Sequence, residues 1–223
     1  MGDHVFGMPP NSVGDIGLLD GIINYDVYGS MGATGYAGAA KVDAYYAAQA
    51  GWKALADSVG TDYAPAVSPG FNDRGVRSGH VPVSRKLTEN DAFGSLFRAM
   101  LQRAKTLTDP DIGHMIFVTS WNEWHEDTQI EPLRLAPPTS VDDSWSGNYY
   151  TGGLAYEGYG TRYLDILREE TFPTLADAIC ILRIVCGLEV PGEDDHLDSD
   201  VNADGKIGLA EIIYIFQKVS KLR

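Results

Sequence analysis

The feature that most constrains the fold is an alternation of short apolar runs with longer amphipathic stretches across the first 170 residues. The short runs have the length expected of buried strands, and the longer stretches carry apolar residues at helical spacing. The predicted strands lie at 21–29, 63–67 and 114–121, and the predicted helices at 41–58, 89–107 and 160–169. Repeated strand–helix units indicate an α/β fold with a parallel sheet and right-handed crossovers.

The balance of charged residues disfavours several classes of partner. The formal net charge is −14 at pH 7, which disfavours nucleic acid and anionic membranes. No run is long and apolar enough to span a bilayer. The first residues lack a basic stretch followed by an apolar core, so we expect no signal peptide in this chain. The composition suits a neutral substrate, cations and an exterior setting.

Two carboxylates follow the third predicted strand, at the end where chemistry gathers in parallel sheets. Glu123 and Glu126 stand among Trp121, Trp124 and His125. Cleavage of a glycosidic bond needs one carboxyl group that donates a proton and another that removes a proton or attacks the sugar. Aromatic faces bind the apolar side of a sugar, so we expect one Trp in the core and the other exposed as a sugar platform. His125 either orients Glu126 or bonds a backbone carbonyl.

The other predicted strands also end in polar or aromatic residues. Tyr25 closes the first, and Asp73 and Arg77 follow the second. Because the carboxyl ends of parallel strands meet at one edge, we expect these residues near the two acids. Asp73 and Arg77 are either a structural ion pair that holds their loop or contacts to a substrate.

Residues 21 to about 134 resemble the C-terminal half of glycoside hydrolase family 99, the endo-α-mannosidase family. The segment SWNEWHEDTQIE at 120–131 is similar to the family's signature, an aromatic residue followed by Asn-Glu-Trp-His-Glu-Gly-Thr-Gln-Ile-Glu. Asp127 stands where the family has Gly. The block PAVSPGFND at 65–73 resembles the family's Pro-Ser-Val-Gly-Pro-Gly-Tyr-Ile-Asp. A related group associated with polysaccharide biosynthesis shares the Trp-Asn-Glu-Trp core.

This resemblance implies a (β/α)8 barrel that cleaves α-mannosidic bonds within a glycan, with retention of configuration. In the family, the Glu matching Glu123 deprotonates the sugar's own 2-hydroxyl group, which attacks C1. The Glu matching Glu126 protonates the leaving oxygen and then activates water. Such substrate-assisted routes are an accepted exception to the two-carboxylate scheme. The resemblance also implies that Tyr25 hydrogen-bonds near the reacting centre.

The predicted elements make only about three to four βα units, whereas a closed barrel of this type typically needs about 250 residues. We therefore expect residues 1–170 to form a partial (β/α)8 TIM-type barrel. We expect such a chain to be either a truncated gene model or an inactive remnant. The alternatives to a hydrolase are a non-catalytic protein that binds calcium and carbohydrate, and a polysaccharide-biosynthesis protein of the related group.

Residues 171–223 form a second unit with an EF-hand calcium loop. Segment 200–211 matches the twelve-residue loop at every key position, with Gly205 at the sharp turn. Hard oxygen ligands in a flexible loop select Ca²⁺, and they predict one structural site. The predicted ligands are Asp200, Asn202, Asp204, the backbone carbonyl of Lys206, and Glu211.

A partial internal repeat runs through this unit, in which residues 174–182 mirror residues 208–216. Duplicated calcium-loop–helix units resemble dockerin modules, which tether secreted enzymes to scaffold proteins. The resemblance implies a cohesin-like scaffold as partner and an extracellular or cell-surface location for the full-length protein. The residues before the first copy contain no turn glycine, so we expect one metal rather than two.

Overall fold

The computed structural model describes residues 2–3, 13–172, 175–188, 206 and 208–220. The chain divides into two compact units, Met1–Leu167 and Arg168–Arg223. Within the part of the chain that is described, every helix is too short or too polar to traverse a lipid bilayer.

Short parallel strands form the centre of the first unit. One sheet has the order β1 (Gly2–Asp3), β2 (Gly21–Ile23) and β3 (Asp62–Ala64), and a second pairs β4 (Ala66–Val67) with β5 (Phe117–Val118). All of these pairs are parallel. Only Pro65 separates β3 from β4, so the two small sheets meet along one stretch of chain. The pairing confirms the α/β class, and the described strands form open sheets rather than a closed barrel.

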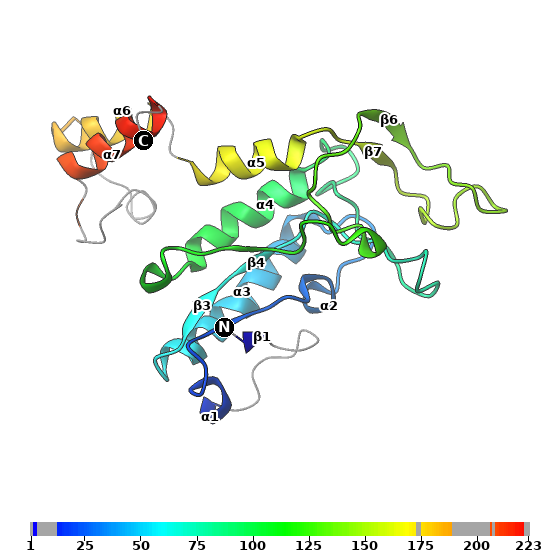
Figure 1. The fold of residues 1–223 in the computed structure, drawn as a ribbon, viewed down its shortest axis with the longest axis horizontal. Coiled ribbons are helices and arrows are strands. Elements are labelled where there is room, and N and C mark those ends of the chain that lie inside the picture. Colours follow the sequence, from blue (N-terminus) through cyan, green and yellow to red (C-terminus); the bar gives the residue numbers. More distant parts are fainter. Residues whose placement is uncertain (1, 4–12, 173–174, 189–205, 207, 221–223) are drawn as a thin grey trace. The chain divides into compact units, whose positions relative to one another are not determined.

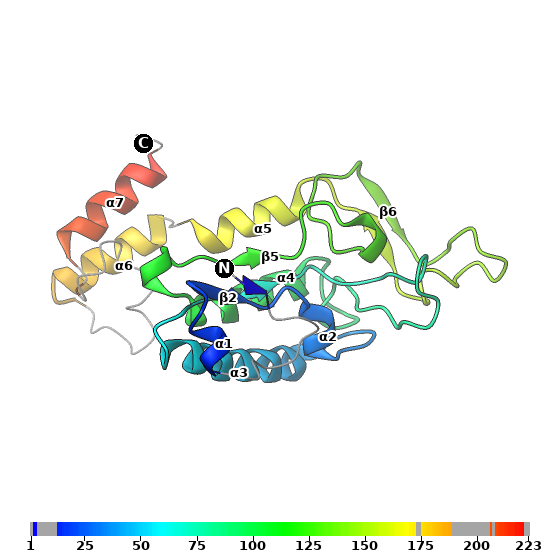
Figure 2. The ribbon, with the colours of Figure 1, turned by 60° about the horizontal axis from the view of Figure 1, so that its bottom comes forward.

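Helices pack against these strands in both views (Figures 1 and 2). The long helices are α3 (Gly38–Asp57), α4 (Ser95–Ala104) and α5 (Arg162–Thr171). The short elements are α1 (Val13–Ile16), α2 (Val27–Met31), η2 (Lys105–Leu107) and η3 (Pro110–Ile112). Helix α4 provides much of the core, because its Phe97, Met100 and Leu101 have no exposed surface. Phe97 meets Tyr163 of α5 edge to face, with ring centroids 5.7 Å apart.

Three predicted elements are much shorter in the structure, two of them because of a local cap or turn. The predicted strand at 21–29 stops at Ile23, since the Asp26 carboxylate accepts from Gly29 N at 2.8 Å and begins α2. The predicted helix at 89–107 begins only at Ser95, after Gly94 with φ of 87°. The predicted strand at 114–121 is reduced to β5, and an irregular loop follows it.

A hairpin in the first unit was missed. β6 (Ala136–Thr139) and β7 (Tyr156–Gly158) pair antiparallel, and their connecting loop projects from the unit in both views (Figures 1 and 2). The sequence hid β6 because Pro137 and Pro138 occupy its middle. Proline is tolerated there because β6 and β7 pair only with each other, which leaves each with an open edge.

Among the described residues from 175 onward, the second unit has the helices α6 (Leu175–Val185) and α7 (Leu209–Val219). Each begins in one copy of the internal repeat, at 174–182 and 208–216. They pack through a small apolar cluster made of Ala178, Ile181, Ile212 and Ile215. The loop between them lies almost entirely outside the described residues.

The burial of α4 gives a stability prediction with a matched control. Leu101 is fully buried and Leu135 is 75% exposed. Leu101→Ala should lower the free energy of unfolding by about 2–5 kcal/mol, because it removes buried methyl groups and leaves a cavity. Leu135→Ala should change the free energy by less than about 0.5 kcal/mol. Urea unfolding of the purified chain measures both; equal losses would contradict the core described for α4.

Candidate active site

The candidate site is the loop that follows β5, and hydrogen bonds close the base of this loop. Ser120 N donates to the Thr128 carbonyl at 2.8 Å, and the Ser120 and Thr128 hydroxyl groups lie 2.8 Å apart. Ser120 Oγ also accepts from Glu123 N at 2.9 Å. Both hydroxyl-bearing residues are buried. The acids at 123 and 126 therefore sit on a loop with a fixed stem.

A single turn of 3₁₀ helix, η4 (Trp124–Glu126), carries the acidic residues. Glu123 is the N-cap of this turn, and its Oε1 lies 3.3 Å from His125 N. Asp127 ends the turn in the left-handed region, with φ of 49°. Both glutamates are partly exposed. One short turn thus presents both carboxylates from the same loop.

Arg77 joins the second strand end to this turn. Its Nη1 lies 2.8 Å from Asp73 Oδ2 and 3.1 Å from Glu126 Oε1. Asp73 is fully buried, and its Oδ2 also lies 2.8 Å from His80 Nδ1. The hydrogen bonds to Asp73 and Glu126 raise the pKa of Arg77, so the guanidinium stays charged. The structure therefore contains the Asp73–Arg77 ion pair, and contact of either residue with substrate stays a prediction.

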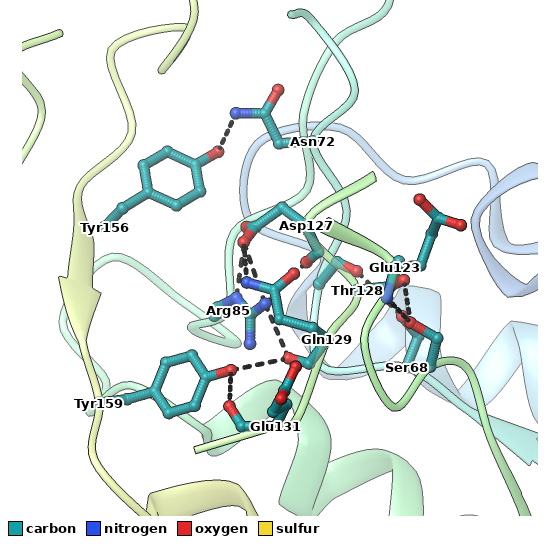
Figure 3. Close-up of polar contacts among 12 residues, drawn as sticks. Ser68, Asn72, Arg85, Glu123, Asp127, Thr128, Gln129, Glu131, Tyr156 and Tyr159 are labelled. Carbon is teal, nitrogen blue, oxygen red and sulfur yellow. Dashed lines mark hydrogen bonds and ion pairs between the residues drawn. The ribbon is translucent and has the colours of Figure 1, made fainter. Parts of the chain in front are cut away.

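Backbone contacts bring the remaining segments to the same place. Asn72 N donates to the Glu126 carbonyl at 2.7 Å, and the Asn72 side chain donates to the Tyr156 hydroxyl at 2.8 Å (Figure 3). The Tyr25 carbonyl accepts from Thr119 Oγ1 at 3.1 Å, just before the loop. The ends of three predicted strands therefore meet around the acidic turn, as expected of a parallel arrangement.

The aromatic residues of the loop differ from the prediction. Trp121 is 52% exposed and Trp124 is 51% exposed. The expectation that one of them lies in the core was wrong, because Trp121 stands on the loop and Trp124 on η4, beyond the end of the strand. Tyr25 is also 46% exposed. The His125 ring is exposed and makes no hydrogen bond among the described residues, so neither predicted contact of the ring is seen.

Sequence reasoning missed Arg85, which is only 4% exposed. Its Nη2 donates to the Asp127 carbonyl at 2.8 Å and to the Gln129 carbonyl at 3.0 Å (Figure 3). Its guanidinium also lies over the Tyr159 and Tyr163 rings, at 5.1 and 4.9 Å from their centroids. Burial raises the pKa of Tyr159 to about 12, so this phenol stays protonated and donates to the Gln129 and Glu131 carbonyls. An arginine among polar residues carries no sequence signal of such a role.

The predicted calcium ligands are only partly described. Asp200, Asn202 and Asp204 lie outside the described residues, and Lys206 is exposed. Glu211 is 1% exposed, and its Oε2 accepts from Gly208 N at 2.7 Å. Its Oε1 is buried without a hydrogen-bond partner among the described residues. A buried carboxylate oxygen without a partner is costly, so it fits a residue that ligates a cation.

Comparison with known proteins found relatives named as endo-mannosidases. A glycoprotein endo-alpha-1,2-mannosidase-like protein of Danio rerio is 38% identical over 89 residues, which cover 40% of this chain and 18% of that protein. The human protein of the same name is 37% identical over 83 residues, covering 36% of this chain and 16% of the relative. The chain thus spans at most 18% of the length of these relatives. No family model matches the chain.

Solved structures give a weaker likeness. The GH99 endo-alpha-mannosidase from Bacteroides thetaiotaomicron is 25% identical and superposes with a TM-score of 0.38, over 68% of this chain and 39% of that chain. A structure described as a glycoside hydrolase-like protein is 21% identical, with a TM-score of 0.43 over 68% of this chain and 37% of that chain. Both scores lie below 0.5, so the relationship to glycoside hydrolases depends on the sequence matches.

The closed stem of the loop gives a prediction on stability. Ser120→Ala leaves Glu123 N–H without its acceptor and the buried Thr128 hydroxyl without its partner. The free energy of unfolding should fall by about 1–3 kcal/mol. Ser146→Ala, at an exposed serine of the hairpin loop, should cost less than about 0.5 kcal/mol. Denaturant titration of both variants compares the costs, and an unchanged Ser120→Ala midpoint would show that the stem does not hold the loop.

Proposed function

We propose that this chain is part of a glycoside hydrolase that cleaves α-mannosidic bonds in glycans or polysaccharides. One observation carries the proposal: Glu123 and Glu126 are presented by one turn, on a loop that also carries two half-exposed tryptophans, Trp121 and Trp124. Acidic groups beside exposed aromatic faces suit a neutral sugar. The sequence similarity to endo-mannosidase-like proteins supports the choice of substrate. A partial barrel of the TIM type is the proposed scaffold.

The proposed chemistry assigns one role to each acid. Glu123 removes the proton from the sugar's 2-hydroxyl group, and the resulting oxygen attacks C1 as the glycosidic bond breaks. Glu126 donates a proton to the departing oxygen and later takes one from the water that opens the intermediate, while Glu123 returns its proton to the sugar's 2-oxygen. Arg77 holds the Glu126 carboxylate at 3.1 Å and is itself held by Asp73. Trp121, Trp124, His125 and Tyr25 are the proposed sugar contacts.

For the second unit we propose one structural Ca²⁺. Asp200, Asn202, Asp204, the Lys206 carbonyl and Glu211 would hold it. The buried Glu211 carboxylate, whose Oε1 has no hydrogen-bond partner within the described part of the chain, supports this proposal. The ion would supply charge neutralisation for a loop rich in carboxylates. Exposed apolar side chains on α7, among them Leu209 and Ile213, offer a surface to a cohesin-like scaffold outside the cell.

Loss of the proposed acid tests the catalytic assignment. Glu126→Gln should lower hydrolysis of an α-mannooligosaccharide by about 10²–10⁴-fold, because an amide cannot transfer the proton. Binding of the same glycan should persist. Release of reducing ends measures the first, and calorimetry the second. The control is Glu89→Gln, at an exposed glutamate outside the site, which should keep full activity.

Two other outcomes separate the alternative functions. Glycan binding without turnover in the wild-type chain would indicate a binding protein rather than a hydrolase. Activity that requires a nucleotide-activated sugar would indicate polysaccharide biosynthesis.

Calcium binding has its own test. Titration of Ca²⁺ into the metal-free chain should give one site, and Glu211→Gln should abolish it while Glu89→Gln leaves it intact. Calcium at about 100 times its dissociation constant should stabilise the second unit by about 2.7 kcal/mol, since only the folded state binds it. Calorimetry and thermal unfolding with and without a chelator measure both effects. The absence of binding heat in the wild-type chain would refute the site.

A further inference from the structure

We propose that Arg85 and Asp127 form the device that positions the acidic turn for catalysis. This inference rests on the proposed function, because the turn matters for chemistry only if Glu123 and Glu126 act on a substrate. Arg85 is a positioning residue rather than a catalytic one, since its guanidinium is buried and contacts residues that follow the turn.

Arg85 grips the C-terminal end of the turn at several points (Figure 3). Its Nη2 lies 3.0 Å from Asp127 Oδ1 and its Nε lies 3.3 Å from Asp127 Oδ2. The orientation of the guanidinium is further restricted, because the same Nη2 also donates to the carbonyls of Asp127 and Gln129 at 2.8 and 3.0 Å. A planar guanidinium that holds one residue by both main chain and side chain fixes that residue's orientation.

The contacts of Arg85 with Asp127 also restrain the proposed acid, Glu126, because Asp127 follows it directly in the chain. With Asp127 fixed at φ of 49°, the direction in which the backbone leaves Glu126 is set. Arg77 then holds the Glu126 carboxylate itself, at 3.1 Å. Two arginines thus act on Glu126. Arg85 acts indirectly, by holding the backbone of the next residue, and Arg77 acts directly on the Glu126 carboxylate.

Arg85 is itself held in place by its own segment. Phe71 and Val83 exchange backbone hydrogen bonds of 3.0 and 2.8 Å, which aligns the strand end at 68–73 with the segment before Arg85. Gly70 allows this approach, because a Cβ at that position would lie 2.8 Å from Arg85 Cγ. The backbone that carries the Arg85 side chain is therefore held in a fixed position relative to the strand end at 68–73.

Asp127 is needed because the cation is buried. Burial alone lowers the pKa of the Arg85 guanidinium, but the adjacent Asp127 carboxylate raises the pKa above its ordinary value. A buried cation that loses its counter-charge is strongly destabilising, so the turn is secured by charge as well as by geometry. Asp127 carries this carboxylate at φ of 49°, a backbone conformation that glycine adopts freely.

This combination allows a test that separates the ion pair from the backbone conformation. Asp127→Gly removes the carboxylate and favours the observed φ, and Asp127→Asn removes only the charge. If the ion pair positions the acid, both variants should lower kcat by about 10–100-fold with KM changed less than about twofold, and both should alter the pH profile of kcat. Asp127→Glu, which restores the charge, should recover part of kcat. The matched control is Asp43→Asn, which breaks the exposed Arg103–Asp43 pair of 2.9 Å.

Wild-type kcat and pH profile in Asp127→Gly would overturn the proposal, since the carboxylate would then be dispensable. A second readout does not need substrate: amide hydrogen exchange at residues 123–128 should speed up at least tenfold in Asp127→Asn and stay unchanged in Asp43→Asn. Faster exchange in a chain that cleaves no glycan would contradict the proposed function and leave the positioning of the turn intact. Unchanged exchange in an active chain would contradict the positioning alone.

Discussion

The site depends on the parallel pairing of β4 with β5. Because both strands run the same way, the chain leaves them at the same edge, and residues 68–77 come to lie against residues 119–129. Each strand is very short, so this pairing alone cannot hold two long loops together. The structure adds hydrogen bonds beyond the strands, such as the one from Asn72 N to the Glu126 carbonyl. Hydrogen bonds between the two loops therefore continue the alignment that the β4–β5 pairing starts.

Two ion pairs connect the segments at this edge of the sheet. Arg77 and Arg85 both come from the stretch that follows β4, and each meets a carboxylate of the loop that follows β5. The two arginines differ in burial, since Arg77 has a half-exposed side chain and Arg85 is enclosed. The exposed pair leaves Glu126 accessible to a ligand, and the enclosed pair supports the main chain beneath it. The accessible acid, Glu126, and the enclosed support at Asp127 are thus consecutive residues.

Sequence reasoning succeeded where local pattern decides the outcome. Helical spacing located α3 and α5, and the acidic aromatic segment was placed correctly at a strand end. It failed where a partner far along the chain decides: Arg85 is defined by residues about forty positions away, and nothing near it indicates burial. Proline in β6 and the cap at Asp26 misled the assignment of strands, because turn chemistry overrides apolar content. Exposure of both tryptophans could not be read from spacing in an irregular loop.

The Glu211 carboxylate has a consequence for the tail in surroundings poor in calcium. One of its oxygens already accepts the Gly208 N–H that would otherwise stand open at the start of α7. The helix therefore has its own capped beginning and does not depend on an ion to start winding. A metal-free tail would keep α7 and its apolar contact with α6. The carboxylates of the acidic segment before α7 would then repel one another with no cation to neutralise them.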